Sequence, residues 1–193
     1  EGAEVSHEPP IPNEIRCFCE YLRDAGYYCT NYYKTDYNFD PPDSAWDECS
    51  HEAHWKNRPD ANMPFFAVFN YTYTHEGSTR FSPERHGEVT ARLTPEQRQG
   101  DGFQLDSFPP YYADTRLQRR QWAKYYELIT GLDYWIAERL QELEDAGLAD
   151  DTIVFFWSDH GVGMPRAKRW LYDSGTRIPL IVHIPEQYRT GGQ

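Results

Sequence analysis

Ionisable side chains that could act on a metal or an anion follow three apolar segments of the chain. Lys34 and Asp36 come after the first segment, His75 after the second, and the pair Asp159 and His160 after a third. A carboxylate beside an imidazole suits a divalent cation. The sequence therefore predicts a metal-binding pair at Asp159 and His160.

A further cation, Lys168, lies among arginines in a loop near the C-terminal end, and this group could hold an anion. Each residue also has a structural interpretation when it is taken alone. A lone histidine at the end of a strand, such as His75, is commonly a structural residue, and Asp-His-Gly is also turn-forming chemistry. The chemical hypothesis depends on these residues meeting at one place.

Strands must deliver these side chains to a common edge. Aromatic residues 27–33 and the apolar runs 65–69, 152–157 and 178–184 have strand length. The runs 65–69 and 152–157 lack polar alternation, which is typical of strands buried on both faces in a parallel sheet. Because the carboxyl ends of parallel strands share one edge, we expect the candidate side chains to converge there.

Helices are predicted between these strands. Residues 15–25 keep helical spacing after a possible N-cap at Asn13, and residues 122–143 keep it until Gly147. The alternation predicts an α/β fold with a mostly parallel sheet flanked by helices.

Two stretches, at about 38–64 and 76–114, have no sustained period and are predicted to be long functional excursions from the sheet. The pair Asp150 and Asp151 precedes its strand and is predicted to be a turn. Asn70 begins a glycosylation sequon but ends a buried strand, so we expect no modification there.

The formal charge of −12 argues against nucleic acid as a partner, because a phosphate-binding surface needs an excess of Lys and Arg. No apolar run approaches the roughly 18 to 20 residues of a membrane span. Free buried thiols are the favoured interpretation of the four cysteines, although disulfides and metal ligation stay open: Cys17, Cys19, Cys29 and Cys49.

Three longer segments, taken together, resemble the sulfatase family: the helix at 122–143, residues 147–161 with Ser-Asp-His-Gly, and residues 168–182. Upstream, residues 20–28 resemble the helix that follows the nucleophile of that family, and residues 65–75 resemble the strand that presents its substrate histidine. The general style is similar to bacterial heparan N-sulfatase-like members. The resemblance implies an alkaline-phosphatase-like sulfatase core, with residues 1–193 an internal part of one catalytic domain.

The resemblance also implies roles for single residues. Asp159 and His160 match two metal ligands, His75 the histidine near the leaving atom, and Lys168 the lysine that contacts a sulfate oxygen. Lys34 matches a further catalytic lysine.

Next to Lys34 the sequence departs from the family pattern. Tyr33 replaces a glycine, and Asp36 stands where a histidine is expected, so Asp36 is a candidate for substrate binding only.

A larger departure concerns the nucleophile. The family's early Asp-Asp pair and its Cys/Ser-x-Pro-Ser-Arg motif, whose first residue becomes formylglycine, do not occur in these 193 residues. Cys17 and Cys19 lack the proline, serine and arginine of the motif. We therefore expect that the nucleophile lies in a missing N-terminal region and that this chain alone is inactive.

The resemblance implies hydrolysis of sulfuric esters or sulfamates on sulfated sugars, assisted by one divalent cation, with calcium expected, and by formylglycine. A phosphodiesterase or phosphonate hydrolase of the same superfamily is one alternative, and a catalytically inactive glycan-binding relative is another. The implied partner is a sulfated carbohydrate. The implied location is the periplasm or the exterior, and the oligomeric state stays open.

Overall fold

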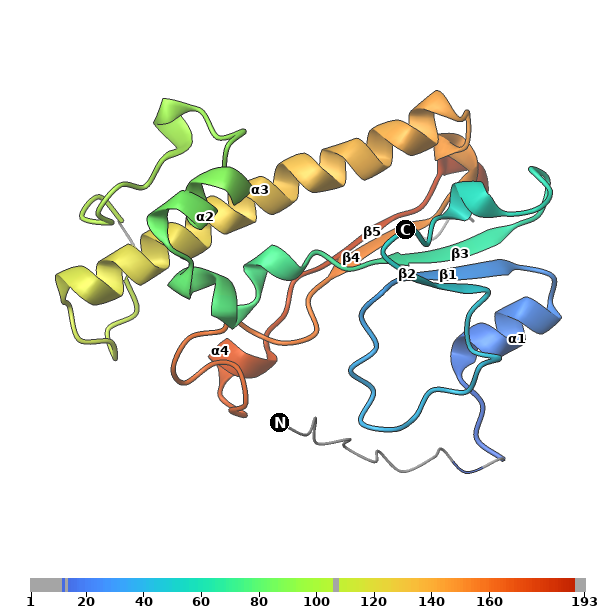
Figure 1. Ribbon diagram of the computed structural model, residues 1–193, viewed down its shortest axis with the longest axis horizontal. Coiled ribbons are helices and arrows are strands. Elements are labelled where there is room, and N and C mark those ends of the chain that lie inside the picture. The colour runs from blue at the N-terminus through green and yellow to red at the C-terminus, as the bar shows by residue number, and fades with distance from the viewer. Residues whose placement is uncertain (1–11, 13, 106–107, 190–193) are drawn as a thin grey trace. The chain divides into compact units, whose positions relative to one another are not determined.

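The computed structural model describes residues 12, 14–105 and 108–189, which fold into two compact units, residues 1–71 and 72–193 (Figure 1). Both units combine helices with strands, so the α/β prediction is confirmed. The predicted cap Asn13 lies outside the described residues. The assignment of all 193 residues to one catalytic domain stays a prediction.

Unit 1 contains a parallel sheet with the strand order β2-β1-β3. Strands β1 (Tyr28–Tyr32) and β3 (Phe65–Phe69) confirm the two strands predicted in this region, with β1 shorter by one residue at each end. Strand β2 (Glu48–Ser50) was not predicted, because its three residues lie inside the excursion at 38–64. The parallel register pairs Tyr28 with Phe65 and Thr30 with Glu48.

Helix α1 (Phe18–Asp24) packs against β1 and starts three residues later than predicted. The reason is a capping box, in which the Glu20 carboxylate accepts a hydrogen bond of 2.7 Å from the backbone N–H of Cys17. Ile15 therefore stays outside the helix and is 53% exposed.

The four cysteines are free thiols, which confirms the favoured interpretation. Cys19 and Cys29 are buried in the core of unit 1 beside Ala45, and burial together with the Asp47 carboxylate raises the pKa of Cys29 to about 12. Burial is wrong for Cys49, which lies in the short strand β2 and is exposed, and Cys17 is only partly buried.

Unit 2 is built on helix α3 (Arg116–Asp145), which confirms the long predicted helix and extends it by six residues at its N-terminus. Thr115 sets that start, because its side chain caps the helix and accepts a hydrogen bond from the backbone N–H of Gln118. Leu128 lies fully buried on the inner side of α3.

Helix α2 (Pro83–Val89) was missed within the excursion at 76–114 and lies beside α3 (Figure 1). Its His86 ring lies 2.8 Å from the Glu127 carboxylate of α3. Burial pushes the pKa of Glu127 upward, but the hydrogen bonds from His86 and from the Gln99 N–H outweigh burial, so the pKa is lowered. Polar contacts therefore join α2 to α3.

Strands β4 (Val154–Trp157) and β5 (Leu180–His183) pair antiparallel in unit 2, so the prediction that the last strands run parallel is wrong. A parallel pair needs a long crossover, usually a helix. The chain between β4 and β5 instead folds back as a loop whose one α-helix, α4, covers only Asp173–Thr176.

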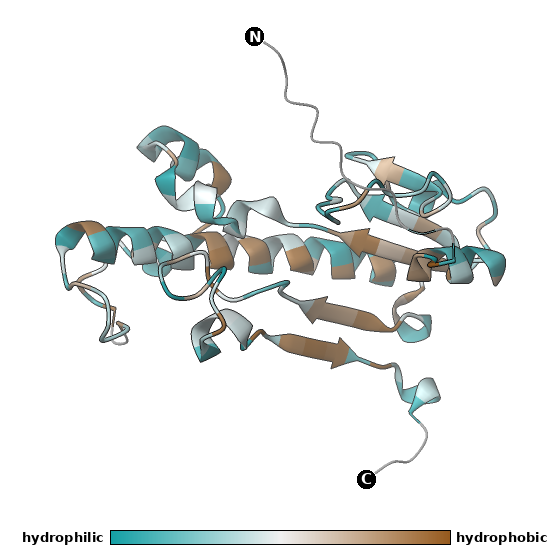
Figure 2. Ribbon diagram, turned by 90° about the horizontal axis from the view of Figure 1, so that it is seen from below, coloured by the Kyte–Doolittle hydropathy of each residue, from teal (hydrophilic) through white to brown (hydrophobic). Residues whose placement is uncertain are grey.

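The expected burial of β4 on both faces is also wrong, and β5 is exposed as well. Both strands are apolar along most of their length (Figure 2), yet Phe155, Trp157 and Leu180 are 56%, 52% and 64% exposed. Among the described residues, no helix is long and apolar enough to cross a bilayer.

Candidate functional site

His75 and Lys168 meet in unit 2, although 93 residues separate them in the sequence. The Lys168 Nζ atom lies 3.1 Å from His75 Nε2. His75 stands immediately before the 3-10 helix η3 (Glu76–Arg80), which packs on α3, and Lys168 lies on the loop between β4 and β5. Two of the predicted site residues are therefore brought together.

The capping contact of η3 indicates which nitrogen of His75 carries the proton. The backbone N–H of Gly77 donates to His75 Nδ1 at 3.3 Å, so Nδ1 acts as an acceptor. In a neutral ring the proton then belongs on Nε2, the atom that faces Lys168. Both groups are donors in this state, and one anionic oxygen lying to the side of this contact, within hydrogen-bond distance of both nitrogens, would accept from each.

Glu76 joins the two cations of the loop. Its carboxylate accepts two hydrogen bonds from Arg169, of 2.7 and 2.9 Å, and lies 3.5 Å from Lys168 Nζ. The Arg169 hydrogen bond, followed by the charges of Lys168 and Arg169, lowers the pKa of Glu76 to about 2, although burial acts in the opposite direction. Glu76 is therefore an anion at all ordinary pH values and holds Lys168 in place.

Glycines allow the loop to approach this cluster closely. A Cβ atom on Gly163 would lie 2.5 Å from the Cβ of Glu76, and one on Gly161 would lie 1.9 Å from the Ser174 carbonyl oxygen. Real Cβ atoms do not come this near to other atoms. The absence of side chains at these two positions is thus a condition for the geometry of the site.

Asp159 and His160 lie just after β4, separated from it by Ser158, as the sequence predicted. His160 Nδ1 lies 2.6 Å from the carbonyl oxygen of Gly161, which can only accept, so the ring proton is on Nδ1. In a neutral ring the lone pair is then on His160 Nε2, which lies 3.5 Å from Asp159 Oδ2. A carbonyl that fixes the tautomer in this way is the usual outer support of a metal-binding histidine.

These two donors fit part of a metal site only. The described residues contain no group of three or more His, Cys, Asp or Glu side chains arranged for a metal ion. A calcium ion takes six to eight oxygen ligands, so further ligands would have to come from elsewhere in the protein. The metal role of Asp159 and His160 stays a prediction.

The loop limits how far this pair can lie from the cluster around Glu76. The Lys168 N–H donates to the Val162 carbonyl at 3.0 Å, and Gly163 packs against Glu76. Four residues of extended chain span at most about 14 Å. Asp159 therefore lies within that reach of Gly163, on the same loop.

Lys34 and Asp36 lie in unit 1 and form an ion pair with each other at 3.5 Å. The backbone there is fixed by Asn31, whose side-chain amide donates to the Lys34 carbonyl at 2.8 Å. Asn70 donates in turn to the Asn31 side chain at 2.9 Å, which gives the sequon asparagine a structural role. The catalytic role of Lys34 and the substrate-binding role of Asp36 stay predictions.

Tyr33 shows why a glycine was expected at its position. Its φ of 53° lies in the left-handed region, where glycine has no steric cost and a tyrosine does. The tyrosine ring is stacked on His51, with centroids 3.7 Å apart, and this contact offsets some of that cost.

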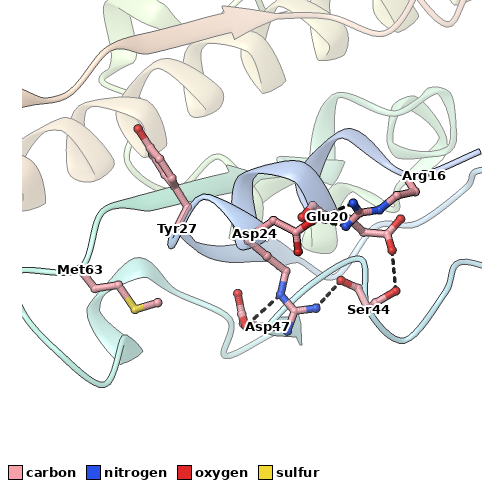
Figure 3. Close-up of a pocket in the computed structure, with 8 residues that line it drawn as sticks. Arg16, Glu20, Asp24, Tyr27, Ser44, Asp47 and Met63 are labelled. Atoms are coloured by element: carbon pink, nitrogen blue, oxygen red, sulfur yellow. Dashed lines mark hydrogen bonds and ion pairs between the residues drawn. The ribbon is translucent and has the colours of Figure 1, made fainter.

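A cavity of about 360 Å³ in unit 1 contains none of the predicted site residues (Figure 3). Its charged groups are paired with one another, as Arg16 with Asp24 at 2.7 Å and the Glu20 carboxylate with the Ser44 hydroxyl at 2.6 Å. A depression lined by paired charges has little to offer an anionic substrate, so we do not assign the site to it.

One member of the candidate site, Glu76, was missed in the sequence, and a second, Arg169, was expected to bind another partner. Glu76 could have been recognised because it is an acid adjacent to His75 and the loop opposite is rich in cations. Arg169 was expected to hold an anion with Lys168, but its guanidinium is committed to Glu76. Only the fold brings these partners together.

The sequence model of the sulfatase family matches residues 53–193, and the chain belongs to this family. An ulvan-active sulfatase from Formosa agariphila is 42% identical over 94% of the chain, and the human N-sulphoglucosamine sulphohydrolase is 39% identical over 46%. The chain spans only 34% and 18% of the lengths of these two relatives.

Solved structures share the fold at low sequence identity. A phosphonate monoester hydrolase from Silicibacter pomeroyi has a TM-score of 0.60 at 17% identity, covering 93% of this chain and 55% of its own. A sulfatase candidate from Bacteroides fragilis has a TM-score of 0.55 at 20% identity, covering 92% and 51%. These similarities confirm an alkaline-phosphatase-like fold.

Proposed function

We propose that this chain is part of an enzyme that hydrolyses sulfuric esters or sulfamates on sulfated glycans. Membership of the sulfatase family supports the reaction, and the names of the ulvan-active and N-sulphoglucosamine relatives support the substrate class. The observation that carries the proposal is the 3.1 Å contact between His75 Nε2 and Lys168 Nζ.

These two side chains can divide the work of the reaction. The Lys168 ammonium binds a sulfuryl oxygen and stabilises the negative charge that develops on it. His75 donates its Nε2 proton to the leaving oxygen or nitrogen as the bond from that atom to sulfur breaks. Glu76 keeps Lys168 beside His75 throughout.

Two groups would come from beyond the described residues. A divalent cation, proposed to be calcium and held in part by Asp159 and His160, would stabilise charge on the sulfuryl group. A formylglycine outside these 193 residues would supply the nucleophile. We further propose that Lys34 contributes to the same site and that the protein acts in the periplasm or outside the cell.

The experiment is an assay of the longer protein that contains this chain, with 4-nitrocatechol sulfate and with ulvan oligosaccharides as substrates. We expect turnover by the wild type, no turnover by residues 1–193 alone, and a loss of about 10²- to 10⁴-fold in kcat for His75→Asn. Lys168→Gln should lower kcat to a similar extent.

The matched control is His183→Asn, which changes an exposed histidine on β5 and should leave kcat unchanged. Turnover of a phosphonate monoester in preference to both sulfates would favour the hydrolase alternative. Binding of ulvan without any hydrolysis would favour an inactive relative.

A further inference from the structure

Arg166 is held between two tyrosine rings two residues before Lys168. The guanidinium carbon lies 4.9 Å from the ring centroid of Tyr111 and 4.6 Å from that of Tyr172. Tyr172 also stacks on Trp170, with centroids 6.1 Å apart and an interplanar angle of 25°. One cation and three aromatic rings thus form a continuous cluster on unit 2.

The cluster is open to solvent. Tyr111, Trp170 and Tyr172 are 43%, 58% and 47% exposed, and Arg166 is exposed as well. Large aromatic rings gathered at a surface commonly mark a binding site.

The charge of Arg166 also lacks a counterion within the described part of the chain, where no carboxylate forms an ion pair with it. Its neighbours differ, because Arg169 is paired with Glu76 and Arg177 with Asp173. Stacking uses the two faces of a guanidinium and leaves the N–H donors at its edge available for an anion.

The backbone under Arg166 is fixed. Its φ of 64° lies in the left-handed region, which costs a non-glycine residue about 1 to 3 kcal/mol and persists only where surrounding contacts enforce it. Those contacts are hydrogen bonds from the Tyr112 hydroxyl to the Pro165 carbonyl at 2.5 Å and from the Ser174 hydroxyl to the Arg166 carbonyl at 2.6 Å. The backbone that carries the Arg166 side chain is therefore fixed before any ligand binds.

We propose that Tyr111, Arg166, Trp170 and Tyr172 form a second sugar subsite, which binds the acidic sugar next to the sulfated residue being cleaved. This inference rests on the proposed function. An aromatic ring can pack against the apolar face of a pyranose, and the guanidinium edge can bind a carboxylate or a second sulfate in bidentate fashion. The Cα atoms of Arg166 and Lys168 are at most about 7 Å apart, so adjacent sugars of one glycan could reach both residues.

The test compares Arg166→Gln with wild type in the longer protein, by calorimetric binding of ulvan oligosaccharides and by kinetics on 4-nitrocatechol sulfate. We expect about tenfold weaker binding of the oligosaccharide and a correspondingly higher KM, because a charge-assisted bidentate contact is lost. Turnover of 4-nitrocatechol sulfate should fall far less than turnover of the oligosaccharide, since that molecule has no second sugar. Arg166→Lys, which keeps the charge but loses the planar edge, should recover only part of the affinity.

Arg92→Gln is the matched control. Arg92 also lies over a tyrosine ring, 5.1 Å from the centroid of Tyr134, but its guanidinium is already paired with Glu138. Oligosaccharide binding by this variant should equal that of wild type.

Chemically modified ulvan separates the two sources of the anion. If Arg166 binds a carboxylate, wild type and Arg166→Gln should bind carboxyl-reduced ulvan with equal affinity. If Arg166 binds a second sulfate, the two proteins should instead bind desulfated ulvan with equal affinity. Equal affinity of wild type and Arg166→Gln for unmodified ulvan would overturn the subsite while leaving the proposed function intact. A wild type that neither binds ulvan nor hydrolyses either substrate would overturn both.

Discussion

Glu76 has a pKa of about 2, below its ordinary value of 4.5, chiefly because Arg169 donates two hydrogen bonds to its carboxylate. A carboxyl group whose pKa is lower in the folded state stabilises the fold above the unfolded pKa. That stabilisation is lost as the pH falls through the folded pKa. The relevant window therefore runs from pH 4.5 down to pH 2.

We predict that Glu76→Gln lowers the thermal midpoint of unfolding above pH 5 and that the difference from wild type shrinks as the pH falls from 4.5 to 2. Thermal unfolding followed by circular dichroism at a series of pH values measures this. Arg169→Gln removes the other partner of this ion pair. It should also lower the midpoint above pH 5, and its difference from wild type should shrink over the same pH window. A difference between wild type and Glu76→Gln that stays constant down to pH 2 would contradict this account of Glu76.

At the level of elements, the loop between β4 and β5 depends on glycines that permit close packing. We predict that Gly163→Ala destabilises the protein by about 1 to 3 kcal/mol, as overpacking does, because its Cβ would lie 2.5 Å from the Cβ of Glu76. In the longer protein kcat should also fall, since Lys168 moves with the loop. Urea unfolding measures the loss of stability, and the assay with 4-nitrocatechol sulfate measures the fall in kcat.

Gly87→Ala serves as the comparison for that variant. Gly87 lies in α2, and a Cβ there would meet nothing within 4 Å. We expect a gain in stability of about 0.5 to 1 kcal/mol, because alanine favours the helix. If both substitutions have the same effect, close packing of the loop is not what Gly163 provides.

The elements that the sequence predicted well are those whose pattern is local. The spacing of apolar residues in α3 and the unbroken apolar run of β3 sufficed to find them, and each could be placed from its own residues. Strand β2 and helix α2 were missed, since β2 has three residues and α2 lies within a charged stretch. Their existence depends on partners distant in the sequence, Thr30 to Tyr32 for β2 and Glu127 for α2.

The candidate site was likewise predictable only where a local sequence pattern indicated it. Strand ends pointed to His75 and to the pair Asp159 and His160, and the structure places His75 against Lys168, while the roles of these residues stay predictions. The commitment of Arg169 to Glu76 could not be predicted, because it joins two residues that are 93 positions apart. The antiparallel pairing of β4 with β5 could not be predicted either, because an apolar run does not indicate in which direction it will pair with another strand.

At the scale of the whole molecule, unit 2 exposes an apolar strand pair. Leu180, Ile181 and Val182 of β5 are 64%, 62% and 42% exposed. An exposed apolar strand at a sheet edge is a template for association. The chain also spans only 34% of the length of the ulvan-active sulfatase, so further protein could cover this strand.

We predict that residues 1–193 self-associate and that Leu180→Thr with Val182→Thr reduces this, as measured by sedimentation velocity over a range of concentrations. In the longer protein the same double substitution should lower stability, because there the strand would be covered. Self-association that does not depend on these two side chains would show that another surface is responsible.

Hydrogen bonds hold the pairing of β4 with β5 in place at both of its ends. At one end Gly161 donates to the Gly175 carbonyl at 2.9 Å, and at the other the Gln187 amide and the Tyr188 hydroxyl donate to the Asp151 carboxylate. A shift of one strand by a single residue would turn every side chain of that strand to the opposite face and would break the hydrogen bonds at both ends. The register of the two strands therefore fixes the position of the loop that carries Lys168. The backbone amides at the two ends of the strand pair should exchange with deuterium in a single cooperative opening.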